Sequence, residues 1–254
     1  MFAKQRQLLT EMIDVARLQA ELGQVFPSAD ERKRLLAQIR RVRANVECPH
    51  NESHVLSFIV ELFRLKPEVE GVIVETGCYK GGSTAKISLA ASILGRDLVV
   101  FDSFEGLPEN QEPHDSSLLG HSIKGWFDRG NFAGALEEVR HNVETYGDIR
   151  PVRFVKGWFD DTMPGFTETI CAAYLDVDLA ASTRTCLKYL YPRLAPGGVL
   201  MSQDGDFPLV VDVFRDREFW EDEVGFPMPV VEGLGTKKIL KIVKPAGVGS
   251  LAPA

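Results

Sequence analysis

Acidic residues and glycines follow two apolar stretches of the chain, where they could bind a nucleoside cofactor. The first stretch leads through Glu75 and Thr76 to Gly77 and then, four residues on, to Gly81. Glycine at such a turn lets the backbone bend sharply and approach a ligand closely. The second stretch ends at Asp102, about 27 residues after Glu75, where an acid of a nucleotide-binding fold typically accepts hydrogen bonds from ribose hydroxyls. These residues predict a cofactor site at the C-terminal edge of a parallel sheet.

The glycine spacing indicates which class of cofactor fits. A dinucleotide fingerprint has the pattern G-x-G-x-x-G, which this chain lacks. The chain has Gly77-x-x-x-Gly81-Gly82, a spacing more typical of a loop that binds S-adenosylmethionine (SAM). An NAD-dependent dehydrogenase is therefore the least favoured enzyme class. The glycine loop alone does not decide the cofactor.

Alternating strands and helices are predicted to position this loop. The apolar strands lack a clean alternation of polar residues, which is typical of a parallel sheet buried on both faces. A pair of antiparallel strands, 228–232 and 238–243, is predicted to form a C-terminal hairpin. The sequence therefore predicts an α/β fold with a mostly parallel sheet. Its other predicted strands are 71–76, 97–101, 152–156, 172–177 and 197–202, and its helices are 80–94, 131–146, 180–190 and 208–222.

The N-terminal part of the chain is predicted to be helical. Apolar residues recur at helical spacing in three segments, 4–24, 31–44 and 51–66. Ser28 or Asp30 is expected to cap the second helix and Asn51 the third. We predict a helical arm or lid over residues 1–68, a SAM-binding catalytic domain over 69–244 and a flexible tail over 245–254.

Composition excludes several classes of function. The chain has 254 residues, 44% of them hydrophobic, and a net charge of −7, which disfavours nucleic acid as a partner. No apolar run reaches the roughly 18–20 residues of a membrane span. The four cysteines, which show no CxxC spacing, are interpreted as reduced thiols of a cytoplasmic protein. A homo-oligomer, most simply a dimer, is expected.

Four further segments resemble a known family. They are Phe101–Pro108, Val152–Pro164, Tyr174–Leu179 and Leu190–Gly198, with the sequences FDSFEGLP, VRFVKGWFDDTMP, YLDVDL and LYPRLAPGG. Together with the VETG loop they are similar to the TylF-like family, SAM- and magnesium-dependent O-methyltransferases that methylate sugar hydroxyls on macrolides and aminocoumarins. The resemblance covers roughly residues 70–205 and implies the class I SAM-methyltransferase fold, a Rossmann-like sheet.

The resemblance implies a set of cofactor contacts. Glu75 and Gly77 look like the loop that holds the methionine part of SAM, and Asp102 looks like the ribose-binding acid. Gly157 and Trp158 follow the next strand, where the adenine end is expected. The full set of cofactor-binding residues is predicted to be Glu75, Thr76, Gly77, Gly81, Ser83, Asp102, Ser103, Gly157, Trp158 and Asp176.

The resemblance also implies a magnesium site and a base. Asp176 matches the first metal-binding aspartate of the family, and Asp178 matches the general base of some members. Gln203 and Asp204 fall where the family has two adjacent metal-binding aspartates, so one carboxylate is replaced by an amide. Asp206 is a candidate substitute.

These residue types suit methyl transfer to a hydroxyl. A sugar hydroxyl is a poor nucleophile, so an enzyme must align it and remove its proton. Mg²⁺ prefers oxygen ligands such as Asp176 and Asp204, and it orients a substrate as a Lewis acid. Asp178 is expected to point to the same side as Asp176 if the strand stays extended. As an alternative, Asp176 and Asp178 could cap helix 180–190.

His50 and His54 form a further polar cluster whose function stays open. They are four residues apart and could share one helix face, a spacing compatible with a metal. An exposed, capped helix start is the simpler interpretation, although this segment could instead contact the substrate if it packs over the sheet edge.

The predicted function is methylation of a hydroxyl, most simply of a sugar, on a small secondary metabolite such as an antibiotic precursor. Two alternatives remain: a catechol-type metal-dependent O-methyltransferase, and a non-catalytic scaffold that kept the fold and lost the metal site. The Gln203 substitution is the observation behind the scaffold alternative.

Overall fold

A six-stranded sheet forms the centre of the molecule. The structure is a computed structural model that describes residues 2–26, 28–247 and 249–251. The strand order is β3-β2-β1-β4-β5-β6, and β6 is antiparallel to β5 while the other pairs are parallel. The strands are β1 (Val72–Thr76), β2 (Leu98–Asp102), β3 (Val152–Lys156), β4 (Ile170–Leu175), β5 (Leu194–Ser202) and β6 (Leu240–Val243). The predicted fold class is confirmed.

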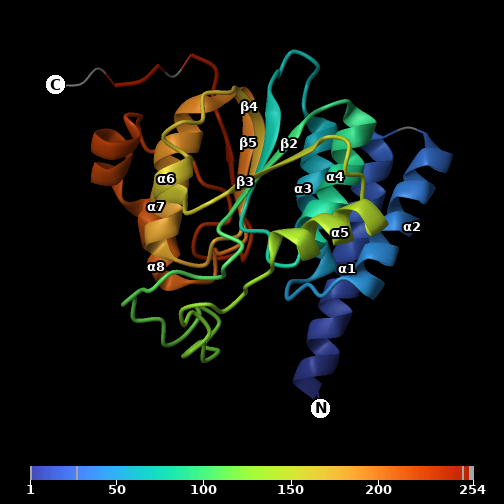
Figure 1. Cartoon of the computed structure of the whole chain (residues 1–254), viewed down its shortest axis with the longest axis horizontal. Helices are drawn as coiled ribbons and strands as arrows, with labels where there is room; N and C mark the ends of the chain where they lie inside the picture. The colour runs from blue at the N-terminus through green and yellow to red at the C-terminus, as the bar shows by residue number, and fades with distance from the viewer. Residues whose placement is uncertain (1, 27, 248, 252–254) are drawn as a thin grey trace.

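Helices cover both faces of the sheet, so the molecule has three layers (Figure 1). One face carries α1 (Phe2–Val25), α2 (Ala29–Asn45), α3 (Glu52–Arg64), α4 (Gly82–Leu94) and α5 (Leu136–Tyr146). The other carries α6 (Phe159–Thr162), α7 (Ala180–Leu190), α8 (Pro208–Arg215) and the short helices η1 (Tyr191–Arg193) and η2 (Phe219–Val224).

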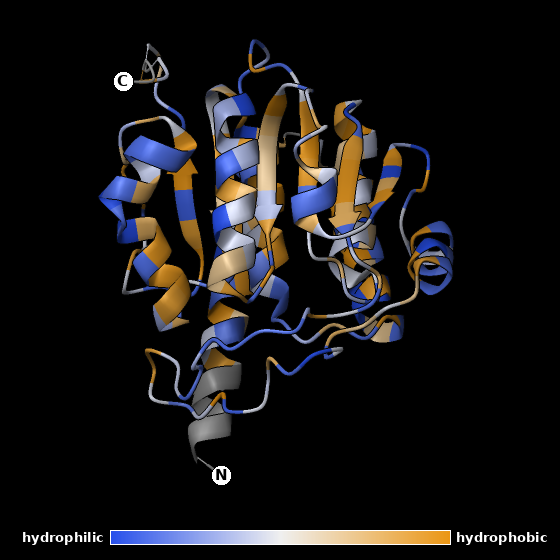
Figure 2. Ribbon diagram, turned by 60° about the vertical axis from the view of Figure 1, so that its left-hand side comes forward, coloured by the Kyte–Doolittle hydropathy of each residue, from blue (hydrophilic) through white to orange (hydrophobic). Residues whose placement is uncertain are grey.

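The strands are apolar because both of their faces are buried. Every residue of β4 is buried, and Figure 2 shows hydrophobic strands between helices whose outer faces are hydrophilic. Ile73 packs in the core under α1–α5, and Val74 packs in the core under α7 and α8. Successive side chains of a strand point to opposite faces of the sheet, so one strand contributes alternate residues to each of the two cores.

The three N-terminal helices agree with the prediction to within a few residues. Segments 4–24, 31–44 and 51–66 correspond to α1, α2 and α3. Leu22, Ile39 and Phe58 bury their side chains in the same core as the sheet. Ser28 and Asn51 occupy the N-cap positions, but neither side chain makes a cap hydrogen bond.

The predicted helix 131–146 begins later than its sequence pattern indicates. Ala135 is the N-cap residue of α5, so the helix starts at Leu136 and not at 131. Phe132 has a φ of 57°, which ordinary residues rarely adopt, and this conformation interrupts any helix there. The Asn131 side chain instead donates to the backbone oxygens of Gly125 and Trp126.

The C-terminal region differs from the prediction in two ways. The predicted helix 208–222 breaks at Asp216, between α8 and η2. The predicted strand 228–232 is reduced to one isolated bridge, between Glu232 and Lys241. β6 therefore pairs antiparallel with β5 and not with segment 228–232. The edge strand β5 gives β6 more paired residues than the local hairpin does.

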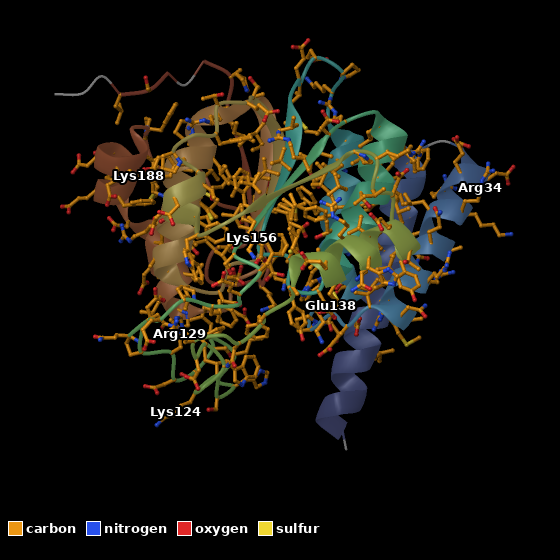
Figure 3. The ribbon with its side chains drawn as sticks, in the orientation of Figure 1. Arg34, Lys124, Arg129, Glu138, Lys156 and Lys188 are labelled. Atoms are coloured by element: carbon orange, nitrogen blue, oxygen red, sulfur yellow. The ribbon has the colours of Figure 1, made fainter. Side chains whose placement is uncertain are left out.

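A long loop between β2 and α5 lies along one edge of the sheet. In Figure 3 its labelled side chains Lys124 and Arg129 point outward from that edge. Glu112 attaches the loop to α7, since its carboxylate accepts hydrogen bonds from the backbone N–H groups of Ala180 and Ala181 at 2.9 and 2.8 Å.

The division of the chain at residue 68 and the role of residues 1–68 as a lid remain predictions. The predicted tail 245–254 has no helix or strand among its described residues, and residues 248 and 252–254 lie outside the described part. In the part of the chain that the structure describes, no helix is long and apolar enough to span a membrane.

Candidate active site

A cavity of about 670 Å³ opens at the C-terminal ends of the strands. This volume lies within the range of roughly 300–1,000 Å³ that is usual for small-molecule sites. The loops after β1, β2, β3, β4 and β5 contribute to its wall, as does the segment before α3. The predicted site residues that line it are Gly77, Asp102, Ser103, Gly157, Trp158, Asp176, Asp178 and Gln203.

Gly77 and Gly157 bring backbone without a side chain to the cavity wall. Both have positive φ, 78° and 144°, which favour glycine. A Cβ on Gly77 would collide with the backbone oxygen of Asp176, so the β1 and β4 ends meet without an intervening side chain. The Gly77 N–H donates to the Phe101 oxygen at 3.0 Å, which fixes the loop against β2.

Asp102 joins the cofactor loop to the end of β2. Its Oδ2 accepts the backbone N–H of Cys78 and its Oδ1 that of Phe104, both at 2.7 Å. Burial raises the pKa of Asp102, and these N–H donors oppose the rise. A carboxylate has about four acceptor sites, so the oxygens retain capacity for hydroxyl donors on the cavity side.

Four predicted cofactor residues lie beneath the cavity wall and do not line it. Glu75, Thr76 and Ser83 are 0%, 0% and 2% exposed. Gly81 has a φ of 80° and precedes α4, where a Cβ would meet Val139 of α5. These residues therefore support the glycine loop from the side that faces away from the cavity.

Glu75 is an unusual buried acid. Neither carboxylate oxygen has a partner at hydrogen-bonding geometry among the described residues. Burial raises its pKa to about 7, and the hydroxyls of Ser83 and Thr84 oppose that rise. Glu75 is therefore protonated over much of the range below neutral pH.

Three aspartates converge on the other side of the cavity. Asp176, Asp178 and Asp204 each place a carboxylate oxygen within 4.8 Å of the other two. Burial and mutual repulsion raise the pKa of Asp176 and Asp178 well above the ordinary range, and burial raises that of Asp204 to about 6. Because burial and mutual repulsion disfavour the ionised carboxylates, a cation bound between them would stabilise their charged form.

Asp178 reaches this cluster by a turn and not by an extended strand. β4 ends at Leu175, and Asp178 has a φ of 64°, so the expected reason for its orientation is wrong. Asp204 Oδ2 accepts the backbone N–H groups of Val177 and Asp178, each at 3.1 Å, and holds the turn. Strain of this kind is common at functional sites. Neither Asp176 nor Asp178 caps α7, since Glu112 does.

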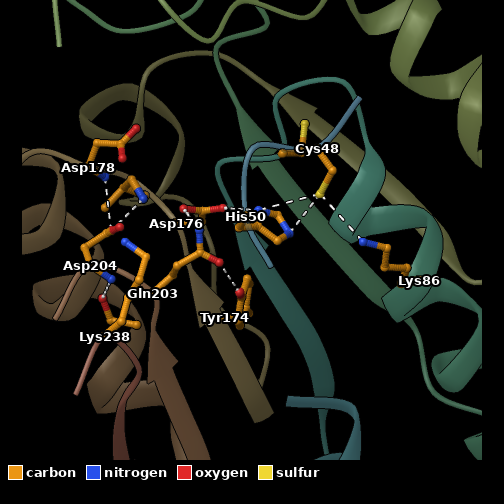
Figure 4. A network of polar contacts seen from close by, with 12 residues as sticks. Cys48, His50, Lys86, Tyr174, Asp176, Asp178, Gln203, Asp204 and Lys238 are labelled. Carbon is orange, nitrogen blue, oxygen red and sulfur yellow. Dashed lines mark hydrogen bonds and ion pairs between the residues drawn. The ribbon is translucent and has the colours of Figure 1, made fainter. Parts of the chain in front are cut away.

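Gln203 does not present an oxygen to the aspartates. Tyr174 donates its hydroxyl to Gln203 Oε1 at 2.6 Å, and Gln203 Nε2 donates to Asp176 Oδ1 at 3.0 Å (Figure 4). The amide thus replaces a like charge by a hydrogen-bond donor. To act as a metal ligand, it would have to turn its oxygen toward the cluster.

Asp206 is paired with a lysine. Its Oδ1 lies 2.7 Å from Lys238 Nζ, at the cavity wall. The Lys238 ammonium also lowers the pKa of the three clustered aspartates against the effect of burial. The sequence pattern gave no signal for Lys238, which was expected only as the first residue of the predicted strand 238–243.

The side chain of His50 is 4% exposed and His54 is half-buried, so the expected exposure of these histidines is wrong. Both line the cavity. Burial lowers the pKa of His50 to about 3 and that of His54 to about 4, so both imidazoles are neutral. His50 Nδ1 lies 3.5 Å from Asp176 Oδ2, a contact that joins the N-terminal helices to the acid cluster (Figure 4).

The residues present fit both SAM and a divalent cation. For SAM, the cavity offers backbone at Gly77 and Gly157 and a carboxylate at Asp102 on successive strand ends. For a cation, Asp204 Oδ1 is buried without a hydrogen-bond partner among the described residues, next to two more carboxylates. Oxygen donors of this kind are those Mg²⁺ prefers.

Comparisons with known proteins point to one family. The model of the macrocin O-methyltransferase family, TylF, matches residues 53–231. An 8-demethyl-8-(2,3-dimethoxy-alpha-L-rhamnosyl)-tetracenomycin-C 4'-O-methyltransferase of Streptomyces olivaceus is 37% identical over 187 residues, 71% of this chain and 69% of the relative. The mycinamicin III 3''-O-methyltransferase of Micromonospora griseorubida is 33% identical over 171 residues, 63% of this chain and 66% of the relative. The structure of the O-methyltransferase NovP, 25% identical, superposes with a TM-score of 0.56 over 84% of this chain and 80% of NovP.

Proposed function

Since the chain belongs to the TylF family of macrocin O-methyltransferases, we propose that it methylates a sugar hydroxyl on a small secondary metabolite with the help of Mg²⁺. That it is a SAM-dependent O-methyltransferase follows from the family. The relatives are named for hydroxyls of glycosylated antibiotics, which supports a sugar acceptor here.

The observation that carries the proposal is the position of Asp178. It lines the cavity, as Asp176 does, and its carboxylate lies within 4.8 Å of those of Asp176 and Asp204. When bound, SAM supplies a methyl group on a sulfonium, which is already activated for in-line displacement. The protein must then align an acceptor hydroxyl and remove its proton.

Asp178 is the proposed general base. In this role the Asp178 carboxylate would accept the proton of the acceptor O–H as that oxygen is methylated. A carboxylate that lines the cavity can serve as a general base for an acceptor hydroxyl bound there. The left-handed turn at Asp178 fixes its carboxylate toward the cavity.

Asp176 and Asp204 are the proposed metal ligands, with Gln203 as a third if its amide turns. When bound, Mg²⁺ would supply Lewis-acid assistance and hold the acceptor's vicinal oxygens. Asp204 additionally holds the turn of Asp178 through two backbone N–H groups. Gln203 keeps Asp176 oriented through its amide nitrogen.

The cofactor is proposed to lie along the ends of β1, β2 and β3. Gly77 would face its methionine part, Asp102 and Ser103 its ribose, and Gly157 and Trp158 its adenine. Glu75, Thr76, Gly81 and Ser83 are proposed to shape the loop from beneath. The arm 1–68 contributes Pro49, His50 and Asn51 to the cavity wall, which supports its role as part of the site.

A direct test combines binding with acceptor screening. Calorimetry is expected to show SAM binding, and a panel of rhamnosylated polyketides is expected to gain one methyl group by mass spectrometry. Catechols in the same panel test the catechol-type alternative. Methylation of catechols but no glycoside would overturn the sugar proposal, and absence of SAM binding would overturn the activity.

A second test addresses the metal. Removal of divalent ions with a chelator is expected to lower turnover by about 100-fold, because Lewis-acid stabilisation is worth several kcal/mol. Added Mg²⁺ should restore it. Turnover that is indifferent to the chelator would contradict the magnesium part of the proposal and leave the methyl transfer intact.

A further inference from the structure

The segment between α2 and α3 reaches into the acid cluster. His50 lies in this segment, with its side chain 4% exposed, and its Nδ1 is 3.5 Å from Asp176 Oδ2. Asp176, which follows β4, lies inside the range 53–231 that the family model matches. His50 thus lies outside the part of the chain that the family model covers.

The ring of His50 also contacts the half-buried thiol of Cys48. Cys48 Sγ lies 3.0 Å from His50 Nε2. Lys86 Nζ lies 3.6 Å from the same sulfur, and Lys86, on α4, is 1% exposed. The four groups form a continuous row from Lys86 through Cys48 and His50 to Asp176 (Figure 4).

The chemistry of the two ends fixes the direction of the hydrogen bonds. An ammonium can only donate, and Asp176 can only accept once its carboxylate is ionised, as it would be when the cluster holds a cation. Lys86 therefore donates to the Cys48 sulfur, which lies 3.0 Å from His50 Nε2 and 3.7 Å from His50 Nδ1, so the S–H can donate to the nearer nitrogen. A neutral imidazole that carries its proton on Nδ1 can then donate to Asp176, whose Oδ2 lies 3.5 Å from that nitrogen.

We propose that His50 is a positioning residue for methyl transfer: its Nδ1–H orients the Asp176 carboxylate, and Cys48 with Lys86 holds the imidazole in that tautomer. The inference rests on the proposed function, in which Asp176 is a metal ligand. His50 acts on Asp176 from one side, and Gln203 Nε2 acts from the other at 3.0 Å. Each carboxylate oxygen keeps its remaining lone pairs for the cavity.

The expected consequence is a change in metal affinity. Hydrogen-bond partners of metal ligands typically change metal affinity or activity by about 10–100-fold when they are removed. The N-terminal helices would then contribute to the chemistry and not only cover the site. We expect neither SAM affinity nor the fold to depend on this contact, because the backbone N–H groups of Cys78 and Phe104 hold the Asp102 carboxylate independently of His50.

Three substitutions at His50 separate the two ring nitrogens. His50→Asn places its amide nitrogen near the former Nδ1 and can still donate to Asp176. His50→Gln places its amide near the former Nε2, toward Cys48, and His50→Ala keeps neither donor. Mn²⁺ binding followed by electron paramagnetic resonance is expected to weaken about 10–100-fold in the Gln and Ala variants and to stay within about threefold of wild type in the Asn variant.

Controls distinguish this effect from misfolding. SAM binding by calorimetry is expected to be unchanged in all three variants, and His141→Asn, at an exposed histidine of α5, is expected to match wild type throughout. Equal losses in all three variants, or no loss in Ala, would overturn the positioning role. Mn²⁺ that fails to bind the wild-type protein would instead overturn the magnesium part of the proposed function.

The tautomer provides a readout that is independent of metal affinity. In protein labelled with ¹⁵N-histidine, with Mg²⁺ present, the His50 signals are expected to report the Nδ1–H tautomer. The chain has five histidines, so the signals are assigned by their loss in His50→Asn. Cys48→Ala should mix the tautomers, and Cys48→Ser should preserve Nδ1–H. An Nε2–H tautomer or an imidazolium in the wild type would overturn the proposal.

Discussion

The two walls of the cavity are built in different ways. At the ends of β1–β3, Asp102 has a backbone N–H on each oxygen, so its charge is already stabilised by the fold. At the ends of β4 and β5, Asp176, Asp178 and Asp204 face one another, and the pKa of each is raised. We call these the cofactor wall and the acid wall.

The difference indicates what each wall requires. The cofactor wall is complete without a further ion, because local turns supply its donors. The acid wall holds more carboxylates than the donors around it can satisfy, so a cation would stabilise its charged form. Substitutions on one wall should therefore leave the affinity of the other nearly unchanged.

The largest expected effect is on the acid wall. Asp178→Asn is expected to lower kcat by about 10²–10⁴-fold, because removal of a general base typically costs that much. SAM affinity, measured by calorimetry, should be unchanged. Asp212→Asn, at an exposed position of α8, is the matched control. Wild-type turnover in Asp178→Asn would remove this residue as the base.

The next effect concerns the buried acid beneath the cofactor wall. The pKa of Glu75 is about 7 in the fold and 4.5 ordinarily, so the folded state binds more protons between these values. Glu75 thus contributes fully to the free energy of unfolding below about pH 4.5. This contribution falls by about 3 kcal/mol as the pH rises to 7.

Glu75→Gln removes the titration and keeps the shape of the side chain. The free energy of unfolding, measured by denaturant titration across this pH range, should fall less steeply in the variant than in wild type. Glu144→Gln, at an exposed position of α5, is the control. Parallel curves for wild type and Glu75→Gln would contradict the raised pKa.

A smaller effect is expected at the other acid of the cofactor wall. Asp102→Asn replaces one acceptor oxygen by a donor that opposes the N–H of Cys78 or Phe104. SAM affinity is expected to fall about 10-fold, as for a lost hydrogen bond to a charged group, with Mn²⁺ affinity unchanged. Asp97→Asn, exposed before β2, is the control. An equal loss of metal affinity would break the distinction between the two walls.

The smallest effect is expected where the long loop meets the acid wall. Glu112→Ala removes the acceptor for the N–H groups of Ala180 and Ala181 and should lower stability by about 1 kcal/mol. Acceptor KM should rise, since the loop borders the cavity, while SAM affinity stays constant. Thermal unfolding and steady-state kinetics check this, with the exposed Glu138→Ala of α5 as control. Unchanged stability would show that the loop is held elsewhere.

Most of the fold followed from the sequence because its signals are local. The apolar runs of β1, β2, β3 and β5, and the spacing in α1–α3, are properties of adjacent residues. The errors lie where tertiary contacts decide. The β6 strand pairs with β5, and the residues before α5 take the left-handed turn at Phe132, which no spacing indicates.

The sequence alone determined the α/β sheet, the glycine turn at Gly77, the acid at Asp102 and the presence of aspartates after β4 and β5. These follow from residue type and order, because strand ends in a parallel sheet meet at one edge. Only the tertiary structure decided that Gln203 turns its nitrogen to Asp176, that Glu112 caps α7 and that His50 is buried against the acids. Those contacts join residues far apart in the chain, and orientation and burial depend on packing that no local pattern encodes.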